Sequence, residues 1–248
     1  MSELVASIRE NYQSALDQIA TAARKSGRSS DEIKLVVVTK SQPLEIVQAA
    51  IEAGVRILGE NYPEEGVTKI QSLPSQSGVE WHMIGHVQSR KARVVAEHFE
   101  LLHSLDSIKL ARRLDRFAAE NDRVLPVLLE FNVGGEESKS GWDASDESRW
   151  DAFLPDVQSI LDLPNLSTHG LMTMPPLGTA PEDSRRFFQR LRLVRDHLAS
   201  LYADTEWSEL SMGTSGDYIV AVEEGATLVR VGTAIVGARR YKSKKEAN

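Results

Sequence analysis

The sequence contains no cysteine. Disulfide bonds, thiolate catalysis and cysteine-based zinc sites are therefore excluded as features of this chain. Long hydrophobic runs are also missing, because no apolar stretch approaches the ~20 residues that span a bilayer. The first residues, Met1-Ser-Glu-Leu4, lack the basic and apolar stretches of a signal peptide. We therefore expect a cytoplasmic protein without membrane attachment.

A shortage of positive charge limits the partners of the chain. Its 29 lysine and arginine residues are outnumbered by 36 aspartate and glutamate residues, which gives a formal net charge of −7. This balance argues against broad binding to nucleic acids or anionic membranes. A basic run that includes Lys242, Lys244 and Lys245 ends the sequence. We interpret residues 241–248 as a solvated tail behind a single domain of residues 1–240.

Short β-branched runs alternate with longer amphipathic segments. Apolar residues at helical spacing from Leu4 to Ala22 predict an N-terminal helix. Eight strands are predicted at Lys34–Thr39, Val55–Leu58, Trp81–Ile84, Leu101–Ser104, Val127–Asn132, Ser167–Met172, Ser208–Met212 and Thr227–Val231. Strict alternation of strand and helix predicts a parallel sheet of the α/β class, and eight repeats favour a single closed (β/α)8 TIM barrel behind one extra helix. A doubly wound open sheet is the alternative.

Lys40 is the first candidate for a functional residue. In a parallel barrel the residues that follow the strands meet at one end, where barrel proteins bind their ligands. Lys40 follows the first strand, directly behind the apolar run Val36–Val38 and Thr39. Partial desolvation favours the neutral amine of a lysine, which can form a Schiff base with an aldehyde. From this position alone, an ordinary lysine at a strand end is the more frequent explanation.

Two further candidates lie on the second and third strands. Asn61 can hydrogen-bond a ring hydroxyl or a carbonyl, or it can serve as a turn residue. If Trp81 points outward, His82 points into the barrel, where it can orient a ligand or belong to the core. The pair His82 and His86 has no carboxylate in the same run, so we predict no metal site.

Glycine and hydroxyl residues follow the last two strands. The seventh is followed by the segment 213–217, which contains Ser215 and Gly216, and the eighth is followed by Gly232 and Thr233. Small residues let backbone N–H groups approach an anion, and barrels frequently bind phosphate between these two loops. The loops therefore predict a phosphate site, with turns that only reverse the chain as the alternative.

Arg230 lies in the middle of the apolar segment Leu228–Gly232. A guanidinium in such surroundings is costly unless it is paired. It either donates a hydrogen bond to the nitrogen of a heteroaromatic ring at the barrel mouth, or forms an ion pair with a carboxylate such as Glu130. The sequence leaves both interpretations open.

The candidate residues belong to an ordered set of motifs. These are Val36-Val-Val-Thr-Lys40, Leu58-Gly-Glu-Asn-Tyr62, Trp81-His-Met-Ile-Gly85, Glu137-Ser-Lys-Ser-Gly141, Gly170-Leu-Met172, Leu210-Ser-Met-Gly213 and Val229-Arg-Val-Gly-Thr-Ala234. In this order the motifs resemble the pyridoxal phosphate homeostasis proteins, one-domain relatives of the alanine racemase N-terminal barrel. The resemblance extends from about Ser7 to Arg239.

The resemblance implies a cofactor, pyridoxal 5′-phosphate, held as a Schiff base on Lys40. The residues expected around it are Asn61, His82, Ser215, Gly216, Arg230, Gly232 and Thr233. Ser215, Gly232 and Thr233 would bind the phosphate. Arg230 would face the pyridine nitrogen, whereas the asparagine and the histidine would line the ring.

Two segments depart from the family pattern. Thr214 and Gly216 stand where the family usually has a methionine and an acidic residue, although Ser215 itself is retained. After the third strand the chain reads Gln88-Ser-Arg90-Lys91, where the family usually reads Gln-x-Asn-Lys. The function of that loop is therefore not predicted.

The resemblance implies a binding protein without catalytic activity that buffers the cofactor or delivers it to pyridoxal-phosphate-dependent apoenzymes. Alanine racemases add a C-terminal β domain that supplies a tyrosine base, and we find no corresponding segment, which also favours a monomer. One alternative is a small racemase that uses Tyr62 or Tyr218 as an acid or base. Another is a Schiff-base aldolase that uses Lys40 without a cofactor.

Overall fold

The computed structural model describes residues 2–73, 78–176 and 178–238. The strands of the barrel are β1 Lys34–Val38, β2 Ile57–Glu60, β3 Glu80–Met83, β4 Leu101–Leu105, β5 Leu125–Asn132, β7 Leu166–Met172, β8 Glu209–Thr214 and β9 Leu228–Val231. They match the eight predicted strands to within a few residues. A short strand that was not predicted, β6 (Trp142–Asp143), pairs with the end of β5. The predicted basic tail, residues 241–248, lies outside the described residues.

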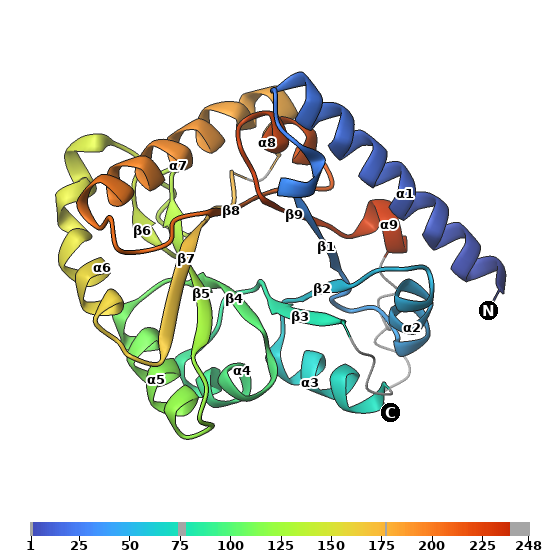
Figure 1. Ribbon diagram of the computed structural model, residues 1–248, viewed down its shortest axis with the longest axis horizontal. Coiled ribbons are helices and arrows are strands. Elements are labelled where there is room, and N and C mark those ends of the chain that lie inside the picture. Colours follow the sequence, from blue (N-terminus) through green and yellow to red (C-terminus); the bar gives the residue numbers. More distant parts are fainter. Residues whose placement is uncertain (1, 74–77, 177, 239–248) are drawn as a thin grey trace.

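The barrel strands are all parallel and form a closed ring (Figure 1). Their order is β4-β3-β2-β1-β9-β8-β7-β5, and pairing between β4 and β5 closes the ring. The predicted (β/α)8 barrel is therefore confirmed, and the open doubly wound sheet is wrong. Closure brings β1 beside β9, so that Val36 lies opposite Arg230 although the two residues are far apart in the sequence.

Helices cover the outside of the ring (Figure 1). They are α1 Ser2–Lys25, α2 Leu44–Glu52, α3 Pro63–Ser72, α4 Ala92–His98, α5 Ile108–Ala119, α6 Leu154–Leu161, α7 Pro181–Leu201, α8 Tyr218–Glu223 and α9 Thr233–Val236. Short 3-10 turns lie at Ser30–Glu32, Ser89–Lys91 and Glu147–Ala152. The predicted N-terminal helix is α1, which buries Ile8 and Ile19 and contacts α2, α8 and α9. In the described part of the chain, no helix combines the length and apolar character that a bilayer crossing requires.

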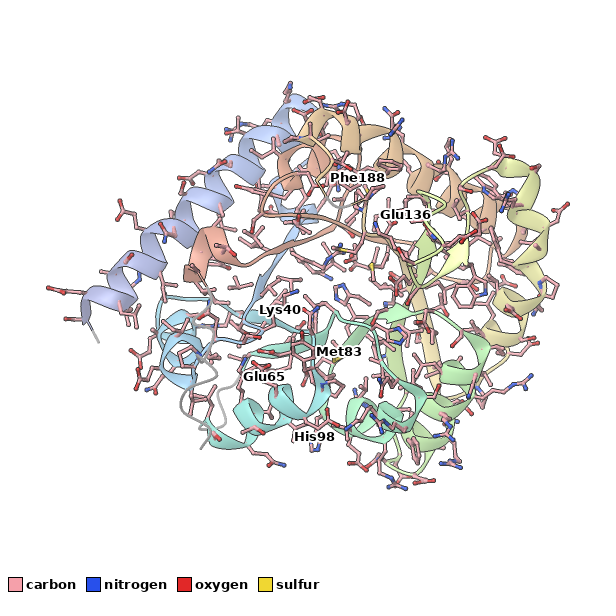
Figure 2. The ribbon with its side chains drawn as sticks, turned by 180° about the vertical axis from the view of Figure 1, so that it is seen from behind. Lys40, Glu65, Met83, His98, Glu136 and Phe188 are labelled. Carbon is pink, nitrogen blue, oxygen red and sulfur yellow. The ribbon has the colours of Figure 1, made fainter. Side chains whose placement is uncertain are left out.

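The hydrophobic core has two unequal parts, because successive residues of a strand point to opposite faces. Val37 of β1 belongs to the large cluster between the sheet and the helices. The neighbouring Val36 points into the ring and joins a small apolar cluster with Leu128, Met172 and Leu228. Side chains between the strands and the outer helices carry most of the apolar burial, and Figure 2 labels one of them, the buried Phe188 of α7.

Much of the ring interior is polar. His82, His103, Ser211 and Arg230 come from β3, β4, β8 and β9 and are almost completely buried. Barrel interiors are usually filled by layers of branched apolar side chains. The polar layer in this barrel therefore needs a hydrogen-bonding explanation, which the contacts described below provide.

Gly170 in β7 lies close against the backbone of the neighbouring strand β8. Its φ is 152°, and an added Cβ would lie 1.9 Å from the backbone oxygen of Glu209 in β8. We expect Gly170→Ala to lower the free energy of unfolding, measured by urea denaturation, by roughly 2–4 kcal/mol. Gly27→Ala is the control, because Gly27 also has a positive φ of 73° but nothing lies within 4 Å of the added Cβ. If both variants lost the same free energy of unfolding, the close contact with Glu209 would not be the cause of the loss at Gly170.

Candidate functional site

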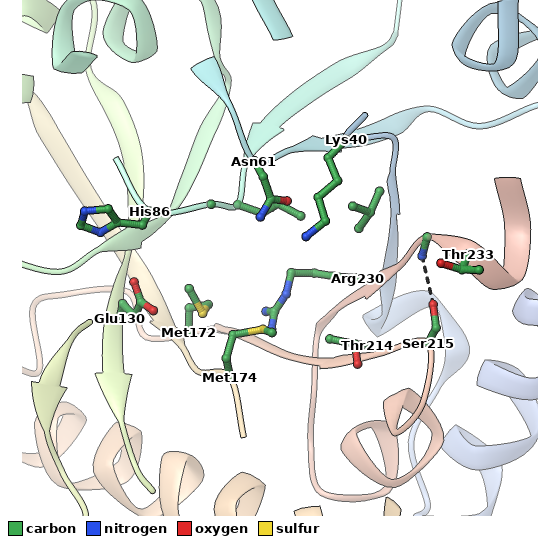
Figure 3. A pocket seen from close by; sticks show the side chains of 14 residues that line it. Lys40, Asn61, His86, Glu130, Met172, Met174, Thr214, Ser215, Arg230 and Thr233 are labelled. Atoms are coloured by element: carbon green, nitrogen blue, oxygen red, sulfur yellow. Dashed lines mark hydrogen bonds between the residues drawn. The ribbon is translucent and has the colours of Figure 1, made fainter. Parts of the chain in front are cut away.

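A cavity of about 440 Å³ opens at the ends of the barrel strands. Its lining consists of Val38, Lys40, Asn61, Ile84, Gly85, His86, Glu130, Met172, Met174, Thr214, Ser215, Arg230, Gly232 and Thr233. Figure 3 shows the ends of the Lys40 and Arg230 side chains pointing into the same space. The volume lies in the range of small-molecule sites, which are about 300–1,000 Å³.

Six of the predicted site residues line this cavity: Lys40, Asn61, Ser215, Arg230, Gly232 and Thr233. Two do not. Gly216 is exposed in the turn between β8 and α8. His82 is buried deeper in the ring, where its Nδ1 lies 3.0 Å from Nε2 of His103. Its position fits the core-residue interpretation better than direct contact with a ligand.

The backbone on both sides of Lys40 is clamped. Thr39 donates its hydroxyl to Oε1 of Glu60 at 2.6 Å, and the Thr39 carbonyl accepts from Nζ of Lys69 at 2.7 Å. On the other side, the Ser41 N–H donates to Oε1 of Glu65 at 2.6 Å. Ser41 has a φ of 57°, which is uncommon for a residue with a side chain. These contacts hold the root of the Lys40 side chain at the cavity wall.

The clamp is an ion triad on β2 and α3, in which Glu60 and Lys69 are buried and Glu65 is partly exposed. Nζ of Lys69 lies 2.7 Å from Oε1 of Glu60 and 2.7 Å from Oε1 of Glu65. Burial raises the pKa of Glu60, and the Lys69 ammonium opposes that shift. Sequence reasoning missed the triad. The i, i+4 spacing of Glu65 and Lys69 gave a signal for one pair, but such pairs are usually exposed on a helix surface.

The loops after β8 and β9 form a polar rim on one side of the cavity. The Gly232 N–H donates to Oγ of Ser215 at 3.2 Å, shown by the dashed line in Figure 3. A Cβ at Gly232 would lie 3.2 Å from Cβ and the backbone oxygen of Val38. Only glycine therefore leaves this backbone uncrowded. With the exposed Ser215 and Thr233 hydroxyls, the rim offers several donors to an anion.

Arg230 forms the floor of the cavity. Its guanidinium donates to Oγ of Ser211, to the Thr173 carbonyl at 2.9 Å and to Sδ of Met174 at 3.0 Å. Among the ion pairs of the described residues, none joins Arg230 to Glu130, so the predicted pairing is not found. Burial lowers the pKa of Arg230 to about 10, opposed by Asp217 and Glu130. The group therefore remains a cation at neutral pH.

Glu130 lies across the cavity from Ser215 and Thr233, beside His86 (Figure 3). Its Oε2 is buried and has no hydrogen-bond partner among the described residues. Burial raises the pKa of this carboxyl to about 7, and the nearby Asp106 adds to the shift. Sequence reasoning considered Glu130 only as an ion-pair partner. Alternation along β5 from the inward Leu128 could have placed it in the cavity.

The predicted acid/base tyrosines and Asn61 occupy different surroundings. Tyr62 is 56% exposed and Tyr218 is buried, and neither belongs to the described lining of the cavity. Asn61 does line the cavity, and its buried Oδ1 has no hydrogen-bond partner among the described residues. This carbonyl oxygen is available to a ligand that donates a hydrogen bond, such as a ring hydroxyl.

Together, the lysine, the buried guanidinium and the donor-rich rim define a class of protein. It is a (β/α)8 barrel whose cavity combines an amine with donors suited to a phosphorylated ligand that carries a carbonyl group. The amine can condense with the carbonyl, the rim can bind the phosphate, and the floor can donate to the ligand between them.

Comparisons with known proteins identify the family. Residues 11–240 match the family described as alanine racemase, N-terminal domain. A pyridoxal phosphate homeostasis protein from Vibrio alginolyticus is 38% identical over 240 residues, which cover 96% of this chain and 100% of that protein. The chain belongs to the pyridoxal phosphate homeostasis protein family, within this wider racemase-related group.

Solved structures agree with this assignment. PipY from Synechococcus elongatus PCC7942, solved without pyridoxal phosphate, superposes with a TM-score of 0.81 at 34% identity. The match covers 93% of this chain and all of that one. A second PipY structure, with pyridoxal phosphate bound, matches with a TM-score of 0.76 at 34% identity and covers 88% of this chain and 100% of that chain.

Lys69→Met tests the clamp around Lys40. The substitution leaves the buried Glu60 carboxylate without its ion partner, so we expect the free energy of unfolding to fall by roughly 3–5 kcal/mol in urea denaturation. Lys109→Met on the exposed surface of α5 is the matched control and should change stability by less than about 0.5 kcal/mol. Adding Glu60→Gln to Lys69→Met should restore part of the loss. If Lys69→Met were as stable as Lys109→Met, the ion triad of Glu60, Glu65 and Lys69 would not contribute to stability as described.

We expect Glu130 to make the free energy of unfolding depend on pH. Because its folded-state pKa of about 7 lies above the ordinary value of 4.5, the folded protein binds more protons between these values, and stability falls as pH rises through them. Glu130→Gln should remove this loss, which is on the order of 1–3 kcal/mol. We expect the stability difference, Glu130→Gln minus wild type, to be larger at pH 8 than at pH 5. The exposed Glu137→Gln is the control, and parallel pH profiles for all three proteins would refute the prediction.

Proposed function

We propose that this chain binds pyridoxal 5′-phosphate on Lys40 and takes part in intracellular cofactor homeostasis, buffering the cofactor or delivering it. The observation that carries the proposal is the meeting of Lys40, Arg230 and the Ser215 rim around one cavity. The names of the relatives support it, since they are pyridoxal phosphate homeostasis proteins matched over nearly their full length.

Each part of the cavity suits one part of this cofactor. The bound cofactor supplies an aldehyde that condenses with a primary amine. Lys40 offers that amine from a clamped position. Ser215, Gly232 and Thr233 offer hydroxyl and backbone donors to the phosphate, and the Asn61 carbonyl oxygen can accept from the ring hydroxyl.

Arg230 favours storage over catalysis. A guanidinium can donate to the pyridine nitrogen but cannot readily give up its proton, so it keeps that nitrogen unprotonated. An unprotonated pyridine withdraws electrons weakly, which disfavours removal of a proton from a bound amino acid. We therefore assign no catalytic residue in this proposal.

A small amino-acid racemase is the second candidate, and Glu130 is the observation that favours it. Its carboxyl, with a pKa near 7, lines the same cavity as Lys40 and is suited to proton exchange. Exchange of the α-proton of amino acids in deuterated water separates the two functions. Cofactor storage predicts no catalysed exchange, whereas racemisation requires it.

Several finer points of the proposal stay predictions. Pyridoxal-phosphate-dependent apoenzymes are the proposed recipients of the cofactor, and the chain is proposed to act as a monomer in the cytoplasm. Transfer of the cofactor from the loaded protein to an apoenzyme, followed by the activity of that enzyme, measures the delivery step.

Lys40→Ala tests the attachment point. Wild-type protein mixed with the cofactor should gain visible absorbance, and borohydride should then fix a pyridoxyl group on the peptide that contains Lys40, as read by mass spectrometry. Lys40→Ala should lose both signals, whereas the exposed Lys109→Ala should keep them. An unchanged spectrum in Lys40→Ala would refute attachment at this residue. A wild type that stays colourless but traps a sugar phosphate would favour the aldolase.

A further inference from the structure

A chain of hydrogen bonds crosses the interior of the barrel beneath the cavity. It starts at Arg230 on the cavity floor and passes through Ser211 to Nδ1 of His103, 2.7 Å from the serine oxygen. Nε2 of His103 lies 3.0 Å from Nδ1 of His82. Nε2 of His82 lies 3.2 Å from Oε2 of Glu80, whose side chain is 56% exposed at the opposite end of the strands. The chain therefore joins the cavity floor to solvent.

The Arg230 end fixes the direction of the first bond. A guanidinium has donors and no acceptor, so the Ser211 oxygen accepts from Arg230. The Ser211 hydroxyl keeps its own proton, and we assign the second bond to that proton, which Ser211 donates to Nδ1 of His103. Burial, together with the neighbouring Arg230 cation, holds the pKa of His103 well below its usual range. His103 is therefore neutral, with a bare Nδ1 and its proton on Nε2.

The same direction continues to the surface. The Nε2 proton of His103 points to Nδ1 of His82, which must then be the accepting nitrogen. His82 carries its proton on Nε2 and donates it to Glu80. Hydrogen bonding to His82 lowers the pKa of Glu80, so a carboxylate terminates the chain. Every bond thus runs from the buried cation toward the exposed anion, with one tautomer for each histidine.

This direction stabilises a cation that forms no ion pair with a carboxylate of the described residues. Among the described contacts of Arg230, the three printed donations are to Ser211, Thr173 and Met174. They use three of the five N–H groups of a guanidinium and fix the plane of the group. The aligned dipoles of the hydroxyl and the two imidazoles present their negative ends toward Arg230, which lowers the free-energy cost of burying its charge.

We propose that Ser211, His103 and His82 are positioning residues for Arg230, which aim its remaining N–H groups into the cavity through a hydrogen-bond chain anchored at Glu80. The inference rests on the proposed function, in which Arg230 faces the pyridine nitrogen. It also gives His82 a role, because the histidine acts on the ligand through Arg230 without touching it.

The tautomers provide a test that needs no cofactor. Nitrogen-15 NMR of the imidazole rings in the protein without cofactor, at pH 7, should find a protonated Nε2 and a bare Nδ1 in both His103 and His82. The exposed His86, outside the chain, serves as the spectroscopic reference. A doubly protonated His103, or either ring with its proton on Nδ1, would overturn the proposed chain.

Ser211→Ala tests the effect on the ligand. Loss of this hydroxyl removes a partner of Arg230, so we expect the Kd for pyridoxal 5′-phosphate to rise about tenfold and the absorbance spectrum of the bound cofactor to shift. Ser211→Thr keeps a hydroxyl and should retain most of the affinity and the wild-type spectrum. Ser184→Ala, which removes another buried serine hydroxyl on α7 outside the ring, should bind as wild type does.

The outcomes separate this inference from the proposed function. Wild-type affinity and an unchanged spectrum in Ser211→Ala would overturn the positioning role. If near-ultraviolet circular dichroism shows that Ser211→Ala does not fold, two other measurements test the positioning role. They are the affinity and spectrum of Ser211→Thr and the histidine tautomers of the wild-type protein. A wild type that binds no cofactor would refute the proposed function, and the tautomers would still decide whether the chain runs as described.

Discussion

Closure of a parallel sheet is the constraint on which the site depends. Because all the barrel strands run in the same direction around the ring, every strand ends at the same mouth. Lys40, Glu130 and Arg230 therefore share one cavity, although Lys40 follows β1 and the other two lie in β5 and β9. The pairing of β1 with β9 places the strand before Lys40 beside the strand that carries Arg230.

The parts of the structure that follow from local patterns were predictable. The β-branched run before Lys40 and the alternation of strands with helices predict β1 and the barrel, and the glycine and hydroxyl loops predict the rim. The burial of Lys69 was not predictable, because an i, i+4 ion pair has the same sequence pattern on an exposed helix as in a buried triad. The depth of His82 in the ring was not predictable either, because alternation gives the side to which a residue points but not its distance from the cavity.

Hydrogen-bonded polar side chains occupy much of the interior of this barrel, where apolar side chains are usual. Its inner apolar cluster is small, and the space beneath the cavity holds two histidines, a serine and an arginine. A buried polar network of this kind is tolerated only when its members are satisfied, and then it specifies a single arrangement. Stability comes instead from the larger core between the strands and the outer helices. The outer core thus stabilises the ring, and the polar residues inside the ring orient Arg230 at the cavity.

The adjacency of β1 and β9 has a consequence for the synthesis of the protein. Val37 of β1 pairs with Val231 of β9, so Lys40 and the Gly232 rim come together only across the seam that joins the two ends of the barrel. During synthesis Lys40 leaves the ribosome before the segment that contains Gly232, so the site is completed only after that segment has joined the barrel. Only a fully folded barrel can therefore retain the ligand. A ligand that binds the folded form alone raises the free energy of unfolding of that form.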